Sequence, residues 1–156
     1  MASVKVVRGD LLRQDVEVIV NAWNRNFLPY WLLIPQGVSG SIRRAAGREP
    51  FRELSHKGML PLGGAVLTSA GRLPFKAIIH VAGIGFFWTA SEKSIRLSTA
   101  NALKLAAENE FASLALPLIG AGTGGKQSDM VQAVMLEELE KCDFFGEIRL
   151  VRFGNG

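Results

Sequence analysis

The chain has 156 residues, of which 48% are hydrophobic and 21% charged, and its net charge at neutral pH is +4. This length and composition predict one folded domain over residues 1–156. The apolar stretches are short and broken by Pro, Gly or charge, which argues against a membrane span or a signal peptide. The mild positive charge favours a phosphorylated partner but does not by itself indicate nucleic-acid binding.

The only cysteine of the sequence, Cys142, excludes an internal disulfide and fits a reducing compartment. We therefore expect a cytoplasmic protein. Cys142 has no Cys or His at ligand spacing, so we expect no zinc site, and neither a metal nor a cofactor is predicted.

Short alternating or β-branched segments predict strands at residues 4–8, 16–21, 65–69, 77–81, 113–118 and 147–153. Residues 22–36 are predicted to form a long irregular loop. Helices are predicted at residues 41–46, continuing toward residue 55 after a break near Pro50, and at residues 91–109 and 128–141. Ser91 and Ser128 are the expected N-caps, with Asp129 in the first turn of the last helix.

Strands that alternate with helices predict an α/β fold. We expect a three-layer α/β/α sandwich around a mixed, mostly parallel sheet of about six strands. In such sheets, ligands bind at the carboxyl ends of the strands.

Two glycine-bearing segments each follow a predicted strand. The later one spans residues 114–125, where an apolar run leads into GAGTGG. The earlier one begins at Val16 and leads through the long loop to GVSGSIRRAAG at residues 37–47. Glycines allow backbone N–H groups to approach an anion closely, and a following helix N-terminus adds a positive dipole end. Two such segments suggest a ligand with two phosphates, such as a nucleotide derivative.

The later segment also satisfies two general nucleotide-binding patterns, and both fit poorly. GAGTGGK at residues 120–126 has the spacing of an NTPase P-loop, but Gln127 stands where magnesium coordination needs Ser or Thr. A dinucleotide fingerprint needs an acidic residue at the end of the next strand, whereas Glu147 begins that strand. The alternative is that these glycines only shape a tight turn between a strand and a helix.

With both segments in view, the chain resembles the macro domain family of ADP-ribose-binding modules. The likeness lies in VRGDL at residues 7–11, IVNAWN at 19–24, GVSGSIRRAAG at 37–47, the strands around 63–68 and 78–81, and LIGAGTGG at 118–125. Their order and spacing along nearly the whole chain carry the resemblance, rather than any single motif.

The resemblance implies ligand-binding roles for matched residues at the adenosine and ribose ends. Asp10 would accept a hydrogen bond from the adenine amino group, helped by the backbone of Leu11. Asn21 and Asn24 would orient the loop and the distal ribose hydroxyls. Phe153 lies where relatives place an aromatic side chain against adenine.

The resemblance also assigns the two phosphates of ADP-ribose. The backbone N–H groups of Gly37, Val38 and Ser39 would hold one phosphate. Those of Gly120, Ala121, Gly122, Thr123, Gly124 and Gly125 would hold the other.

Several of these residues have a structural interpretation as well. Asp10 could cap a short helical turn, Asn21 and Asn24 could be turn formers, and Phe153 could belong to the core. His80 ends an apolar strand with no Ser, Asp or second His placed to form a triad, which favours a structural histidine. The arginines at positions 43, 44, 48 and 52 are spaced as on a solvated helix face, or could attract a phosphate-rich partner.

The sequence departs from the family pattern at the first phosphate segment. Hydrolytic relatives carry an Asp after Gly-Val and a His a few residues later, where this chain has Ser39 and Arg43. Serine is a poor general base because its own pKa is far too high. Lys126 and Gln127 stand where relatives often carry an aromatic residue beside the distal ribose. We expect the ADP-ribose slot to be kept and its distal-ribose end to be remodelled.

The preceding loop contains FLPYWLL at residues 27–33, which is too apolar to extend into water. It either packs over the core or forms a lid or a partner-binding patch, in which Tyr30 and Trp31 could stack on a base.

The sequence therefore predicts binding of ADP-ribose or ADP-ribosylated macromolecules as the leading function. The first alternative is an atypical ADP-ribosyl hydrolase or O-acetyl-ADP-ribose deacetylase, with Asn24 and Ser39 as candidate catalytic residues that would orient a water molecule. RNA or poly(A) binding, through the basic excess, Tyr30 and Trp31, is a further alternative. No membrane partner is expected.

Overall fold

The computed structural model describes residues 2–24, 37–58, 60–84, 91–119 and 128–153. The strands are β1 (Ser3–Gly9), β2 (Val18–Asn24), β3 (Ala65–Thr68), β4 (Ala77–Ile84), β5 (Ser113–Pro117) and β6 (Glu147–Phe153). The helices are α1 (Gly37–Ala46), α2 (Glu49–His56), α3 (Glu92–Glu108) and α4 (Ser128–Lys141), with a short 3-10 helix η1 at Leu11–Arg13.

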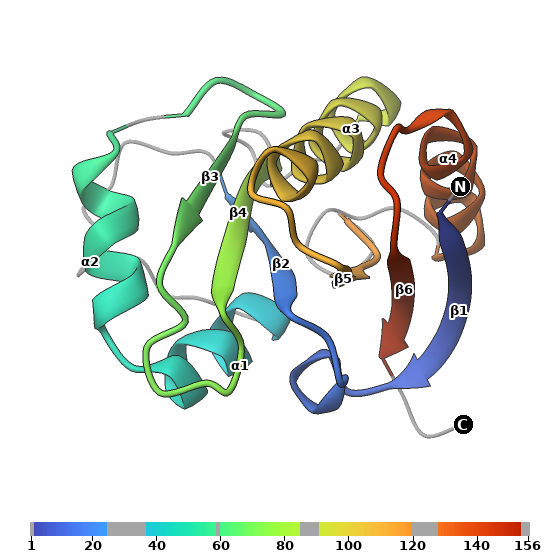
Figure 1. The fold of residues 1–156 in the computed structure, drawn as a ribbon. Coiled ribbons are helices and arrows are strands. Elements are labelled where there is room, and N and C mark those ends of the chain that lie inside the picture. Colours follow the sequence, from blue (N-terminus) through green and yellow to red (C-terminus); the bar gives the residue numbers. More distant parts are fainter. Residues whose placement is uncertain (1, 25–36, 59, 85–90, 120–127, 154–156) are drawn as a thin grey trace.

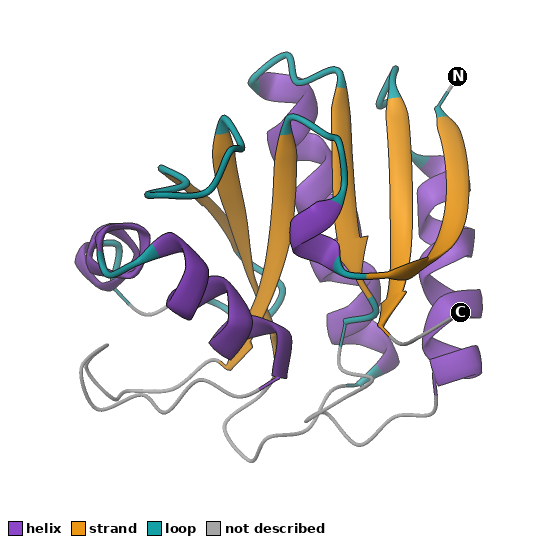
Figure 2. Cartoon of the chain, turned by 90° about the horizontal axis from the view of Figure 1, so that it is seen from below, coloured by secondary structure: helices purple, strands orange, loops and turns teal. Residues whose placement is uncertain are grey.

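The strands form one six-stranded sheet in the order β1-β6-β5-β2-β4-β3. The pairs β1–β6, β6–β5, β5–β2 and β2–β4 are parallel, and β3 pairs antiparallel with β4 at one edge. Helices cover both faces of the sheet (Figures 1 and 2). The mixed, mostly parallel sandwich predicted from the sequence is confirmed.

Successive side chains along each strand point to opposite faces of the sheet, so the core is divided into one cluster on each face. Val18 and Val20 of β2 belong to the cluster that packs with α3 and α4. Ile19, between them, packs on the opposite face with α1 and α2. Both faces of β2 are therefore buried, which explains its nearly continuous β-branched sequence.

The observed bounds differ from the predicted ones around the first glycine-bearing segment. β2 extends to Asn24, so the first residues of the predicted loop belong to a strand. α1 begins at Gly37 rather than at Ser41. The break between α1 and α2 falls at residues 47–48, close to the predicted position near Pro50, and Gly47 ends α1 with φ of +88°. Pro50 lies in the first turn of α2, where its missing N–H costs nothing.

The predicted helix over residues 91–109 is confirmed in α3. Ser91 is its N-cap and forms a reciprocal capping box with Ser94. Ile95, Ala102 and Ala106 lie on the buried face of the helix. α4 spans the predicted residues, but the residue before Ser128 lies outside the described part, so the cap predicted there stays a prediction.

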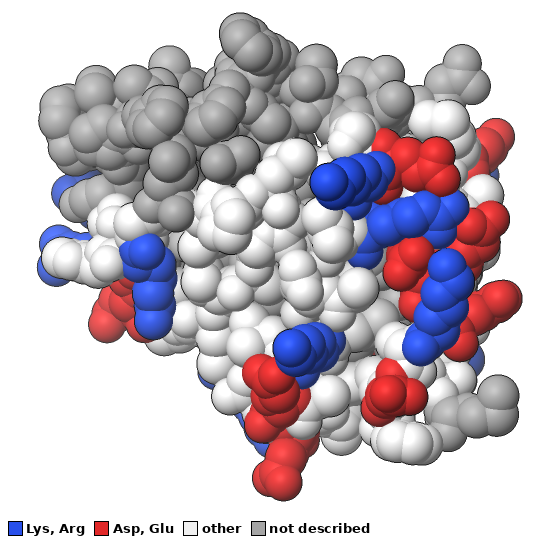
Figure 3. All heavy atoms as spheres, turned by 90° about the horizontal axis from the view of Figure 1, so that it is seen from above, with Lys and Arg blue, Asp and Glu red and all other residues white. Residues whose placement is uncertain are grey.

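An arginine joins α3 to α4 at the surface. Arg96 donates to Glu92 at 2.8 Å on its own helix, and to Glu137 at 2.7 Å and Glu138 at 3.1 Å on α4. Figure 3 shows basic and acidic side chains interleaved on one side of the face that carries these helices. Within the described ranges, no helix is long and apolar enough to cross a membrane.

Candidate ligand-binding site

A pocket of about 490 Å³ lies at the carboxyl ends of β1, β5 and β6. It is lined by Arg8, Gly9, Asp10, Leu11, Leu12, Ser41, Arg44, Pro117, Leu118, Ser128, Val151, Arg152 and Phe153. The pocket therefore lies where ligands bind in parallel α/β sheets. Among its lining are three residues that the sequence predicted as ligand-binding: Asp10, Leu11 and Phe153.

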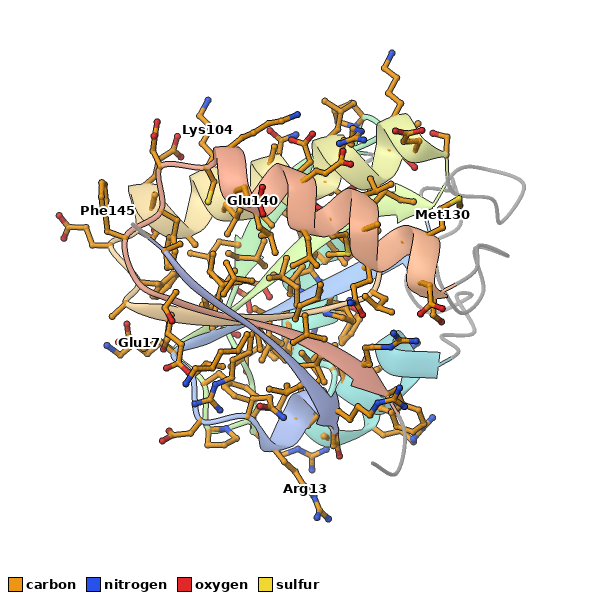
Figure 4. The ribbon with its side chains drawn as sticks, turned by 90° about the vertical axis from the view of Figure 1, so that its right-hand side faces the viewer. Arg13, Glu17, Lys104, Met130, Glu140 and Phe145 are labelled. Atoms are coloured by element: carbon orange, nitrogen blue, oxygen red, sulfur yellow. The ribbon has the colours of Figure 1, made fainter. Side chains whose placement is uncertain are left out.

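Asp10 caps η1, as one interpretation of the sequence held, and it also lines the pocket. Its Oδ1 accepts a hydrogen bond of 2.9 Å from the backbone N–H of Leu12. Its Oδ2 lies 3.9 Å from Nε of Arg13, whose side chain extends away from the protein body (Figure 4). The cap thus occupies one carboxylate oxygen, and the other keeps acceptor capacity for a ligand.

Phe153 is the last residue of β6 and is 83% exposed. The interpretation of this side chain as part of the core is therefore wrong. An aromatic ring that borders a pocket with its face free is suited to stack on a planar base.

Arginines from three elements line the pocket, and sequence reasoning did not assign any of them to the site. Arg8 comes from β1, Arg44 from α1 and Arg152 from β6. For Arg44 and its neighbours the sequence predicts either a solvated helix face or attraction of a phosphate-rich partner, because helical spacing alone does not show that a face borders a pocket. Arg152 Nη1 donates to Asp129 at 2.9 Å and to Gln132 at 3.0 Å on α4.

Asn21 lies apart from the pocket lining, in a buried polar network between β2 and β4. Its Nδ2 lies 3.0 Å from Nδ1 of His80, and Nε2 of the same ring lies 2.8 Å from Oγ1 of Thr68. The Thr68 hydroxyl donates to the carbonyl of Ser69, so it accepts from the ring, and Nδ1 accepts from Asn21. Both nitrogens of a neutral imidazole are thereby satisfied.

His80 is a structural histidine, as the sequence predicted. It is fully buried and packs edge-on against the Phe51 ring. Burial lowers its pKa to about 3, so it stays neutral near pH 7. Asn21 Oδ1, in contrast, is buried without a hydrogen-bond partner in the described structure.

Several other predicted site residues lie partly or wholly outside the described part. The backbone of Gly37, Val38 and Ser39 forms the start of α1, and that of Asn24 ends β2, but none of these side chains is described. Residues 120–125 and the aromatic stretch 27–33 lie outside the described residues. The second glycine-bearing segment connects two residues of the pocket lining, Leu118 and Ser128.

Comparison with known proteins identifies the family to which this fold belongs. Residues 20–135 match the family described as Macro domain. The chain belongs to the macro domain family. A macro domain-containing protein of Listeria monocytogenes is 38% identical over 147 residues, covering 89% of this chain and 80% of the relative.

Two further relatives carry informative names. A protein named O-acetyl-ADP-ribose deacetylase from Klebsiella pneumoniae is 38% identical over 129 residues, covering 78% of this macro domain and 70% of the relative. A solved structure, a variant of the Oceanobacillus iheyensis macrodomain with ADPR, superposes with a TM-score of 0.85 at 28% identity. That alignment covers 97% of this chain and 86% of the other.

Proposed function

We propose that this macro domain binds ADP-ribose or ADP-ribosylated macromolecules in the pocket at the carboxyl ends of β1, β5 and β6. The observation that carries the proposal is the pairing at this pocket of a carboxylate and an exposed aromatic ring. Asp10 supplies an acceptor for the adenine amino group, and Phe153 supplies a face on which adenine stacks. The similarity to a macrodomain structure with ADPR supports the same ligand.

The pyrophosphate belongs to the two glycine-bearing segments in this proposal. The backbone N–H groups at residues 37–39 open α1, so they add the positive end of its dipole to their hydrogen bonds. The segment at residues 120–125 leads from the pocket-lining Leu118 toward α4 and holds the second phosphate. Asn24, at the end of β2, orients the distal ribose, whereas the buried Asn21 supports the end of this strand through its hydrogen bond to His80.

Calorimetric titration with ADP-ribose, ADP and AMP tests the proposal. The informative variant is Asp10→Asn, because the amide keeps an oxygen for the Leu12 N–H but presents a donor in place of Oδ2. We expect affinity for all three ligands to fall about tenfold, the size of one lost charge-assisted hydrogen bond, with no change in thermal stability.

The matched control is Asp15→Asn, which makes the same change at an exposed carboxylate outside the pocket lining. This variant should bind like the unmodified protein. Absence of ADP-ribose binding by the unmodified protein at millimolar ligand would overturn the proposal. Equal binding by the Asp10→Asn variant would remove Asp10 from the site.

The relative named O-acetyl-ADP-ribose deacetylase favours a second candidate function, hydrolysis of this ester. This chain has Ser39 in place of the usual loop carboxylate, so the reaction would rely on Asn24, Ser39 or the substrate phosphate to orient water. Incubation with O-acetyl-ADP-ribose and measurement of released acetate tests it, with Ser39→Ala as the variant. Acetate release no faster than in the heat-inactivated protein would exclude this activity.

A further inference from the structure

The candidate pocket contains more positive charge than its own acidic groups balance. Its lining includes three guanidinium groups, from Arg8, Arg44 and Arg152, and a single carboxylate, that of Asp10. These arginines come from three separate elements, so the surplus results from the fold and not from a run of charges in the sequence.

In the part of the chain that the structure describes, one of the three arginines is held by a carboxylate. Arg152 bonds to Asp129 at 2.9 Å. Arg44 bonds to a neutral group, the Ser41 hydroxyl, at 3.3 Å. Within the described residues, no carboxylate oxygen lies within 4.0 Å of Arg8 or Arg44. Two guanidinium groups that line the pocket therefore have no carboxylate partner among the described residues.

The position of Arg8 indicates that this surplus positive charge lies near the adenosine end of the ligand. Arg8 and Asp10 are separated only by Gly9, at the end of β1. If Asp10 accepts from adenine, as the proposed function holds, Arg8 lies beside the adenosine. The pyrophosphate is assigned to backbone N–H groups of the glycine-bearing segments, so it does not account for this arginine.

We infer that the pocket binds adenosine nucleotides with an additional phosphomonoester on the adenosine ribose. This inference rests on the proposed function for the orientation of the ligand. A phosphomonoester carries close to two negative charges at neutral pH and offers three acceptor oxygens. Guanidinium groups bind such oxygens through paired hydrogen bonds, and two of them match the charge of one phosphomonoester.

Calorimetry with 2′,5′-ADP, 3′,5′-ADP and 5′-AMP tests the inference. We expect at least one of the two bisphosphates to bind about tenfold more tightly than AMP, as for one or two charge-assisted contacts. The preference should shrink when salt is raised from about 50 mM to about 300 mM, because exposed charges are screened.

Charge-neutralising variants assign the preference to particular residues. In the Arg8→Gln and Arg44→Gln variants, the ratio of bisphosphate affinity to 5′-AMP affinity should fall to about threefold or less. Arg52→Gln removes the same charge from α2, outside the pocket, and should leave the preference intact. Equal binding of both bisphosphates and AMP by the unmodified protein overturns the inference.

A phosphodiester at the same ribose oxygen would point to a nucleic-acid ligand instead. The dinucleotide pApA carries a diester with one charge there, so it should bind more weakly than 3′,5′-ADP if the 3′-position is the one recognised. Binding of pApA as tight as the tighter bisphosphate overturns the monoester assignment.

Failure of this inference can be distinguished from failure of the proposed function. ADP-ribose binding that depends on Asp10, without a preference for a bisphosphate, overturns only the inference. A preference for a bisphosphate without any ADP-ribose binding overturns only the proposed function. Absence of binding by every nucleotide overturns both.

Discussion

Asn21 on β2 and His80 on β4 occupy paired positions of two parallel strands, and their side chains form a buried hydrogen bond of 3.0 Å. The ring of His80 is neutral, with Nε2 bound to Thr68 and Nδ1 bound to Asn21. This network lies in the interior of the sheet on the side of α1 and α2, where Phe51 packs against the ring. Its consequences for stability can be measured.

The first prediction is a loss of stability on acidification that depends on His80. Burial holds its pKa near about 3 in the folded state, below the ordinary value of 6.5. The unfolded chain therefore takes up a proton first, and stability is fully present above pH 6.5 and falls as the pH drops toward about 3. Between pH 7 and pH 5 we expect a loss of about 2 kcal/mol from this group.

Urea unfolding at pH 7 and pH 5 measures the effect, with His80→Gln as the comparison. The variant is less stable at both values but should lose about 2 kcal/mol less between them, because its side chain does not titrate. The two proteins share every other titratable group, so the comparison isolates His80. An identical loss in both proteins would show that His80 does not carry the pH dependence.

The second prediction separates the two partners of the ring. Thr68→Val leaves the buried Nε2–H without an acceptor and should cost about 1–3 kcal/mol of unfolding free energy. Asn21→Leu should cost less, because it removes the partner of Nδ1 but also removes Oδ1, which has no partner among the described residues. Denaturant unfolding of both variants tests this order, and a larger cost for Asn21→Leu would contradict it.

The fold could be predicted because apolar pattern and short motifs agree along most of the chain. Helix α3, with its Ser91 cap, and strand β6 have bounds within a residue of the predicted ones. The start of α1 was missed because Gly37 and Gly40 have low helix propensity, so local sequence does not favour a helix there. Tertiary packing of α1 on β2 overrides that preference.

The candidate site could be predicted only where residues follow one another in a motif. Asp10 and Leu11 were found through the Gly-Asp pattern after β1, and they line the pocket. Arg8 and Arg152 were missed because the sheet order, which places β1 beside β6, brings them together. Arg44 was missed because it reaches the pocket from α1, an element far away in the sequence. Parallel neighbours far apart in sequence leave no local signal.

The third prediction concerns two glycines with left-handed backbone conformation. Gly71 has φ of +57°, and a Cβ added to it would lie 2.2 Å from the carbonyl oxygen of Ala46. Gly58 has φ of +75° and no atom within 4 Å of such a Cβ. Gly58→Ala should cost about 1 kcal/mol through backbone strain alone, and Gly71→Ala about 3 kcal/mol or more.

Chemical denaturation of the two alanine variants checks this difference. The same Ala46 oxygen accepts a hydrogen bond of 2.9 Å from the N–H of Arg72, so any shift that relieves the clash at Gly71 also disturbs this bond. Equal destabilisation by the two substitutions would show that the loop around Gly71 adapts freely.

The fourth prediction is that Arg96 stabilises the pairing of α3 with α4 through charge. Arg96→Met leaves Glu92, Glu137 and Glu138 facing one another, so the thermal midpoint should fall at low salt. High salt should reduce the difference in thermal midpoint between this variant and the unmodified protein, because salt screens the charges. Lys93→Met, an exposed position on the same helix, is the control and should have little effect.

Acid should also remove the stabilisation that the ion pair between Arg96 and Glu137 provides. The Arg96 guanidinium holds the pKa of Glu137 below its ordinary value of 4.5. The stabilisation is therefore present above pH 4.5 and is lost as the pH falls through the lower, folded-state value. A difference between Arg96→Met and the unmodified protein that persists unchanged in acid and in high salt would indicate a packing effect instead.

The last prediction uses two exposed phenylalanines that differ in their place on the molecule. Phe153 ends β6 at the pocket and is 83% exposed, whereas Phe145 precedes β6 and is 76% exposed. Phe145 projects from the end of the molecule opposite Met130, which lies near the start of α4 (Figure 4). Neither ring contributes much to the core, so Phe153→Ala and Phe145→Ala should both unfold like the unmodified protein.

Loss of the adenine stack should weaken ADP-ribose binding by the Phe153→Ala variant about tenfold, as base–aromatic stacking contributes about 1–3 kcal/mol. The Phe145→Ala variant should bind normally in the same calorimetric titration, and equal affinities of the two variants would place adenine away from Phe153.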